Sequence, residues 1–256
     1  MRKTRFFNAY RAPFFALPFL ASGAVGATYF SALPGQTSVA NLFNILLAIP
    51  AFYGLRQASG NARALMTLVA LSVFAFSIES LAVLSGIPYG RFSYGPNLGQ
   101  KLFGLVPLTL PVSWIPIVLG SRVWAVAVCG RERVFAVFLL SVFLMVAFDL
   151  IIDPGAVSLK YWTWEEAGDY YGIPETNFVG WLISSTLAQA LVTRCLRPTD
   201  RLPWIVTFSM IWGLFFWTGI AILEGRIALI IWAGLLGASW LRCHARESTG
   251  SSPVSH

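Results

Sequence analysis

Long apolar segments recur along the whole chain and are separated by short polar or aromatic stretches. Eight segments approach the roughly 20 apolar residues that a helix needs to cross a bilayer core of about 30 Å. They cover residues 12–33, 39–55, 65–86, 104–128, 134–152, 178–194, 203–223 and 226–241. The pattern predicts an all-α fold, a polytopic integral membrane helical bundle of about eight transmembrane helices.

The first apolar segment follows a basic start and in that respect resembles a secretory signal. Its apolar stretch continues as far as Leu33, which is long enough for a membrane span. We therefore expect a retained first helix. We predict a single transmembrane domain over residues 1–246 and a disordered polar tail over residues 247–256.

Basic residues divide unequally between the two sides of the predicted bundle. Fourteen of the 18 Lys and Arg fall on the side of the N-terminus, and the other four are Arg91, Lys101, Lys160 and Arg226. Cytoplasmic loops of membrane proteins carry the excess of positive charge. We therefore expect a multi-pass protein of the cell membrane with both termini in the cytoplasm.

The composition supports a lipid environment. Hydrophobic residues make up 57% of the chain and charged residues only 11%, compared with about 25% charged residues in soluble domains. The net charge of +7 is spread over short clusters between apolar runs, which is typical of topology signals and argues against a nucleic-acid partner. Membrane lipid is the predicted partner of most of the surface.

Acidic residues show the opposite distribution, because eight of the 11 Asp and Glu fall on the side with few basic residues. Solvated loop acids account for Glu166, Asp169 and Glu175. They do not account for the acids that lie within apolar helical sequence, of which Glu79 is one. An ionisable group at that depth is costly and is a functional candidate.

Asp149 and Asp153 are two further acids in apolar sequence. Their spacing of four places them on one face of a helix, where their charges repel. One of the two is therefore expected to hold a proton near neutral pH and to serve as an acid. The alternative for Asp153, which precedes Pro154, is that it ends the helix in water.

Two predicted loops on the same side combine rings with glycine and proline. The first covers residues 86–99, and the second, residues 153–181, holds Tyr161, Trp162, Trp164, Tyr170, Tyr171, Phe178 and Trp181. Interfacial aromatics commonly form an anchoring belt, which explains Trp181. Ring faces also stabilise cations, and carboxyl groups transfer protons. The combination suits proton-initiated chemistry on an apolar alkene.

The sequence lacks the residues of several common sites. Its two histidines, His244 and His256, lie near the C-terminus, and its three cysteines follow no metal-ligand spacing. We therefore predict no metal site. No phosphate-binding glycine loop, nucleotide fingerprint or Ser-His-Asp set occurs. We expect no cofactor, and the chemistry must use carboxyl groups, tyrosines and water.

These features together resemble the CruF-type carotenoid biosynthesis proteins. The resemblance covers most of residues 75–181 and is carried by Glu79, Gly86–Tyr94, Asp149, Asp153-Pro154, Tyr161–Trp164, Tyr171–Pro174 and Asn177–Trp181. It implies a carotenoid 1,2-hydratase, a hydro-lyase that adds water to the terminal C1–C2 double bond of an acyclic end group. The implied substrates are lycopene, γ-carotene or a C50 carotenoid such as bisanhydrobacterioruberin, and other carotenoid biosynthesis enzymes are candidate partners.

The hydratase interpretation gives the acids separate roles. We expect Glu79 or Asp149 to protonate C2, and Asp153 to activate the water that captures the tertiary cation at C1. Nearby rings stabilise that cation. The expected substrate-binding residues are Tyr89, Tyr94, Tyr161, Trp162, Trp164, Tyr171, Asn177 and Trp181.

Two other classes use similar residues. A membrane-embedded prenyltransferase holds Mg²⁺ and a diphosphate with Asp pairs. Asp149 and Asp153 have a tolerable spacing for this, but a second Asp-rich motif is absent and basic residues are sparse on that side. A proton-coupled membrane carrier uses buried acids as a relay and moves its substrate without chemical change.

Overall fold

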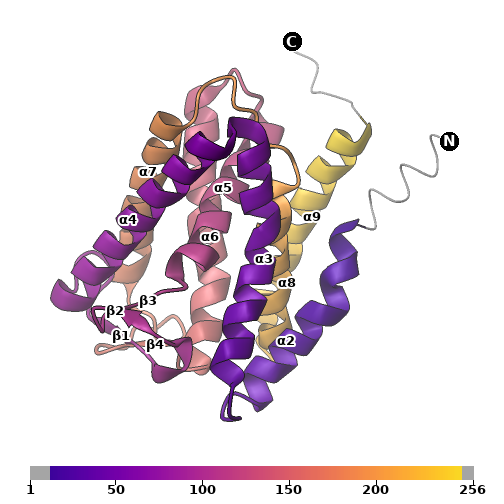
Figure 1. Cartoon of the computed structure of the whole chain (residues 1–256). Coiled ribbons are helices and arrows are strands. Elements are labelled where there is room, and N and C mark those ends of the chain that lie inside the picture. Colours follow the sequence, from indigo (N-terminus) through magenta and orange to yellow (C-terminus); the bar gives the residue numbers. More distant parts are fainter. Residues whose placement is uncertain (1–11, 250–256) are drawn as a thin grey trace.

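The structure is a computed structural model that describes residues 12–249, and each of the eight predicted segments contains a helix (Figure 1). The bounds are η1 (Ala12–Ala16), α2 (Leu17–Tyr29), α3 (Gln36–Ser59), α4 (Asn61–Ser85), α5 (Leu110–Cys129), α6 (Val134–Ser158), α7 (Glu175–Cys195), α8 (Val206–Leu223) and α9 (Ile227–Thr249). The first eleven residues of the predicted single domain lie outside the described residues, as does the part of the predicted tail beyond Thr249, whereas residues 247–249 belong to α9.

Six of these helices, α3, α4, α5, α6, α8 and α9, are long and apolar enough to cross a membrane. The chain therefore forms a membrane helical bundle. The helix around α2 is apolar but shorter, and α7 has the length without the hydropathy. The number of spans and the cytoplasmic location of the termini stay predictions.

Helix α5 lies at the centre of the bundle and packs against α3, α4, α6, α7, α8 and α9 (Figure 1). Its side chains supply much of the main core, including Trp114, Leu119 and Trp124, which are almost fully buried. Beside it, a polar contact joins α3 to α8 where a proline interrupts the backbone ladder of α3. In α3, Pro50 lacks an N–H, and the neighbouring Ala51 N–H donates to Ser209 Oγ of α8 at 3.0 Å.

All short strands lie at one end of the bundle (Figure 1). They are β1 (Phe92–Tyr94), β2 (Lys101–Leu102), β3 (Val106–Pro107) and β4 (Trp162–Trp164). The strands β2 and β3 form one antiparallel pair and β1 and β4 form another, so the α4–α5 and α6–α7 connections are joined to each other. This end of the molecule is called the strand end below.

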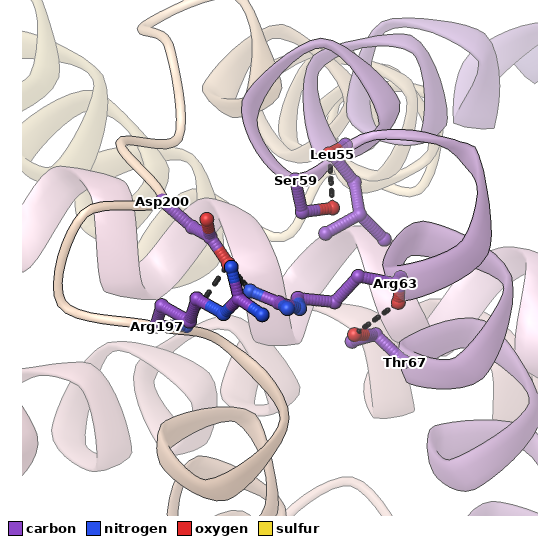
Figure 2. A network of polar contacts seen from close by, with 6 residues as sticks. All are labelled: Leu55, Ser59, Arg63, Thr67, Arg197 and Asp200. Carbon is purple, nitrogen blue, oxygen red and sulfur yellow. Dashed lines mark hydrogen bonds and ion pairs between the residues drawn. The ribbon is translucent and has the colours of Figure 1, made fainter.

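The opposite end carries the connections α3–α4, α5–α6 and α7–α8, and Figure 2 shows a polar contact between the first turn of α4 and the α7–α8 connection. Asp200 Oδ2 accepts a hydrogen bond from the Arg197 backbone N–H at 2.9 Å and forms an ion pair with Arg63 Nη1 at 2.9 Å. The backbone N–H of Arg197 first, and then the Arg63 guanidinium, lower the pKa of Asp200. The contact joins the start of α4 to the α7–α8 connection.

We predict that the Asp200 contact stabilises the fold only when Asp200 is ionised. Because the pKa of Asp200 is lower in the folded state, its contribution is complete above the ordinary aspartate pKa of about 3.9 and is lost as the pH falls through the folded-state value. Asp200→Asn is therefore expected to lower Tm slightly at neutral pH, and the difference from the unmodified protein should vanish in acid. Thermal unfolding at several pH values measures this.

The matched control for that experiment is Glu132→Gln, an exposed acid at the same end of the bundle. This variant should have the same Tm as the unmodified protein at every pH. A Tm difference for Asp200→Asn that persists unchanged in acid would contradict the ionised contact.

Candidate active site

The β1–β4 pair places four aromatic rings side by side at the strand end. Its register pairs Phe92 with Trp164 and Tyr94 with Trp162, and both strands follow the order ring, hydroxyl, ring. Because side chains alternate across a strand, the rings share one face while Ser93 and Thr163 are exposed on the other. The rings contact one another at centroid distances of 5.3–6.0 Å. They form one wall of the site.

The turn after α4 is fixed to α7 through Tyr89. Tyr89 is only 3% exposed, and the Trp164 indole N–H donates to its backbone carbonyl at 2.9 Å. The Tyr89 ring lies against Gly180 of α7, where an added Cβ would approach the ring to 2.3 Å. Glycine at position 180 is therefore required for this close approach.

Glu79 of α4 is buried, with 9% of its surface exposed, and its partner is a loop tyrosine. The Tyr94 hydroxyl donates to Glu79 Oε2 at 2.8 Å. Burial, and then the nearby Glu79 charge, raise the pKa of Tyr94 well above its usual range, so this hydroxyl keeps its proton and stays a donor. The Lys101 ammonium bonds the Tyr94 backbone carbonyl, which ties β2 to β1.

Asp149 and Asp153 are buried on one face of α6, as their spacing predicts, with 0% and 2% of their surfaces exposed. The Asn177 amide nitrogen, in the first turn of α7, donates to Asp149 Oδ2 at 3.1 Å and to Asp153 Oδ2 at 2.6 Å. The Trp162 indole N–H donates to Asp153 Oδ1 at 3.1 Å. Both oxygens of Asp153 are thus occupied, whereas Asp149 Oδ1 is buried without a partner.

The alternative in which Asp153 ends its helix in water is wrong, because α6 continues through Pro154 to Ser158. Proline at position 154 removes the N–H that would bond the carbonyl of Leu150, four residues earlier. The Tyr170 hydroxyl replaces it and donates to that carbonyl at 2.7 Å. The predicted end of this span at residue 152 is therefore too early, and the last turns of α6 hold Asp153 inside the bundle.

The carboxyl groups of Glu79 and Asp153 face one cavity of about 430 Å³ between the helices. Nine of the eleven predicted site residues line it: Glu79, Tyr89, Tyr94, Asp153, Tyr161, Trp162, Trp164, Asn177 and Trp181. Asp149 lies behind Asp153 and is not part of the lining. Tyr171 is also outside it, 37% exposed, with the Arg226 guanidinium 4.9 Å from its ring centroid.

The cavity extends along residues that were not among the predicted site residues. Besides apolar side chains of α2, α5 and α8, these include Asn41 and Asn44 of α3, Phe92, and Trp217 of α8, which meets the Tyr161 ring edge-on at 6.4 Å. The two asparagines, one helical turn apart in an apolar segment, are a polar signal of the kind that marked Glu79. The α8 residues that line the cavity show no comparable polar pattern in the sequence.

The charge balance of the cavity is unusual. Over the described range 12–249, no Lys, Arg or His lines it, and no group of three or more His, Cys, Asp or Glu could hold a metal ion. Its carboxyl groups are therefore held by neutral donors, namely a phenol, an indole and an amide. The arrangement provides two acids at the end of an apolar, ring-lined space, which suits proton transfer to and from an apolar molecule.

Comparison with known proteins gives one family and one named relative. Residues 36–239 match the family described as "Carotenoid biosynthesis protein". The chain is also 36% identical over 189 residues to the bisanhydrobacterioruberin hydratase of Haloarcula japonica. That match covers 68% of this chain and 63% of the relative, so the chain spans less than two thirds of that protein's length. No solved structure matches the chain.

We predict that Tyr170→Phe destabilises the protein although it removes a single hydroxyl. The partly buried carbonyl of Leu150 then has neither its helical donor nor the tyrosine donor, and a hydrogen bond contributes about 0.5–1.5 kcal/mol to stability. A lower Tm is expected in thermal unfolding of the purified protein. The adjacent Tyr171→Phe is the matched control and should leave Tm unchanged; equal Tm values for both variants would contradict the role given to Tyr170.

Proposed function

Because the chain belongs to the carotenoid biosynthesis protein family, we propose that it is a carotenoid hydratase. The reaction adds water across the terminal C1–C2 double bond of an acyclic carotenoid end group and gives a tertiary alcohol. The observation that carries this proposal is the pair of acids, Glu79 and Asp153, at the end of one apolar cavity. The name of the Haloarcula relative supports the same class of reaction.

The shape and lining of the cavity suit the end of a hydrocarbon chain. Its walls come from α2, α3, α5, α6 and α8 and are mostly aliphatic and aromatic. Apolar pockets with a few convergent polar groups are typical small-molecule sites. A carotenoid dissolved in the bilayer enters such a site with its end group toward the acids, and lipid is the medium that supplies it.

We assign the proton donor to Glu79. It lies in an apolar helix with no cation in the cavity, and a neutral carboxylic acid is the form that such surroundings favour. Transfer of its proton to C2 breaks the double bond and leaves a tertiary cation at C1. The Tyr94 hydroxyl then stabilises the carboxylate that forms, through the hydrogen bond to Oε2.

We assign the capture of water to Asp153. Both of its oxygens accept hydrogen bonds, from Trp162 and Asn177, which favours its ionised form. An ionised Asp153 orients a water molecule toward C1 and takes its proton as the C–O bond forms. Asp149 does not line the cavity, so it acts as a positioning residue that shares the Asn177 amide and holds the proton of the pair.

Aromatic rings complete the site because a cation forms within it. Trp162, Trp164 and Tyr161 all line the cavity, and a ring face contributes about 2 kcal/mol or more to a desolvated cation. The reaction adds only water, so the proposal requires no cofactor.

The two rival classes find less support. A diphosphate needs cationic partners, and none of the described residues that line the cavity is basic. A proton-coupled carrier forms no carbocation, so it has no need for the aromatic rings that line this cavity. Both rivals predict no water in the product, so the same experiment tests them.

We predict that a lycopene-producing bacterium expressing this protein accumulates a pigment heavier by one water per modified end group. Glu79→Gln and Asp153→Asn should lower the rate of conversion at least about 100-fold, the usual lower bound for loss of general acid or base assistance. Extracted pigments are measured by mass spectrometry. Glu166→Gln, an exposed acid of the α6–α7 connection, is the control and should convert normally.

Full conversion by Glu79→Gln and by Asp153→Asn would contradict these roles. A pigment lengthened by an isoprene unit would instead assign the protein to the prenyltransferases.

We also predict the origin of the new hydrogen at C2. In D₂O the acid carries deuterium, so the product should contain one carbon-bound deuterium for each hydrated end. Mass spectrometry of product washed in ordinary water, which removes deuterium from the hydroxyl, measures this. Product without carbon-bound deuterium would exclude a solvent-exchanged acid as the donor.

A further inference from the structure

Helix α7 has its polar and apolar faces reversed relative to a soluble helix. Val179, Leu182 and Leu187 are exposed on its outer face. The inner face carries polar side chains that are 0–2% exposed: Asn177, Ser184, Ser185 and Gln189. Polar groups inside a membrane bundle are costly and mark ion, proton or substrate paths.

Three buried polar atoms of α6 and α7 have no hydrogen-bond partner among the described residues. They are Asp149 Oδ1, Ser185 Oγ and Gln189 Oε1. Buried polar groups are paired in more than nine cases out of ten, and a buried water typically bonds two to four such groups. Three orphan acceptors or donors in one interface therefore point to a common ligand, and water is the ligand of matching size and chemistry.

The three atoms follow one another along the interface. The Gln189 amide nitrogen contacts Met145 Sδ of α6 at 3.5 Å. Ser185 lies one turn before Gln189, and Asp149 lies one turn after Met145. Because α6 and α7 run in opposite directions, both Ser185 and Asp149 lie on the strand-end side of that contact.

The orientation of Gln189 is determined by its other partners. Its amide nitrogen donates to the Val118 carbonyl at 2.8 Å and to Ser121 Oγ at 3.1 Å. The Val118 carbonyl only accepts, so the amide cannot be reversed, and Oε1 must point away from α5. The α5 acceptors and the α6 sulfur thus all lie on the nitrogen side of the amide, and Oε1 is a buried acceptor that no described residue bonds.

The hydroxyl of Ser185 also differs from its neighbours. Thr186 and Thr193 donate to the carbonyl four residues earlier, at 2.7 and 2.8 Å, as helical hydroxyls commonly do. Ser185 Oγ makes no such bond. Beyond Gln189, Thr193 Oγ1 accepts a hydrogen bond from Arg122 Nη1 at 3.1 Å at an exposed position near the end opposite the strands.

We propose that internal water held by Asp149 Oδ1, Ser185 Oγ and Gln189 Oε1 carries protons between the Asp149–Asp153 pair and the Arg122 end of the bundle. Each step passes a proton along a hydrogen bond and changes no other bond. The use of this path rests on the proposed hydration, in which Asp153 gains a proton from water while Glu79 loses one. The path lets the pair exchange protons without admitting bulk water to the cavity.

Infrared spectroscopy of the purified protein without carotenoid tests this path. A protonated carboxyl group gives a carbonyl band that shifts when its proton is replaced by deuterium, and Asp149→Asn identifies the band of Asp149. After transfer to D₂O, Ser185→Ala and Gln189→Met should slow the shift about tenfold, the change expected when the barrier rises by one net hydrogen bond. Thr186→Val, next to Ser185 on the lipid face, should exchange at the normal rate.

Two results would overturn the proposal: absence of a protonated Asp149 band, or unchanged exchange in both variants. Ser185→Ala removes one oxygen atom and so keeps the test usable if Gln189→Met does not fold, which gel filtration and Tm report. Because no carotenoid is present, failure here leaves the hydratase assignment intact. Failure of the pigment assay likewise leaves the exchange measurement valid.

Discussion

The structure depends on the burial of three carboxyl groups among apolar helices, beside a cavity that no basic side chain of the described residues lines. Such groups are stable only if protons or neutral donors replace the water that they lose. Here the donors are the Tyr94 hydroxyl, the Trp162 indole and the Asn177 amide, which come from β1, β4 and α7. The pairing of β1 with β4 and the start of α7 at Glu175 are therefore the features that fix the acids in place.

The same constraint explains the unusual end of α6. Asp153 can face the cavity only if α6 continues past it, and the next residue is proline. The chain meets this conflict with a tyrosine from the following connection, since Tyr170 supplies the hydrogen bond that Pro154 removes. The rings of this loop have different roles: Trp162 bonds a carboxyl group, Tyr170 replaces a missing helical hydrogen bond, and Tyr171 lies at the surface.

Sequence reasoning found the parts of this arrangement that depend on short-range spacing. The position of each helix follows from apolar segment length, and the shared face of Asp149 and Asp153 follows from their separation of four. Contacts between distant segments were not predictable in this way. Strands of three residues, such as Phe92–Tyr94, are too short for a reliable alternation, so the β1–β4 pair was missed. Nothing in the residue types distinguishes Tyr170 from Tyr171, and only packing shows which one faces α6.

The hydropathy of α7 connects the fold to the chemistry. A cation generated in an apolar cavity is captured by whatever nucleophile reaches it, or it loses a proton and reverts to alkene. Controlled hydration therefore needs a dry space for the hydrocarbon and a separate polar surface for water and protons. The apolar walls of α2, α3, α5 and α8 provide the first. In the proposed mechanism the buried polar face of α7 provides the second, and this explains why the helix that supplies Asn177 to the acids has a lower hydropathy than the six long apolar helices. The low hydropathy of α7 is thus a consequence of its position between the carboxyl pair and the far end of the bundle.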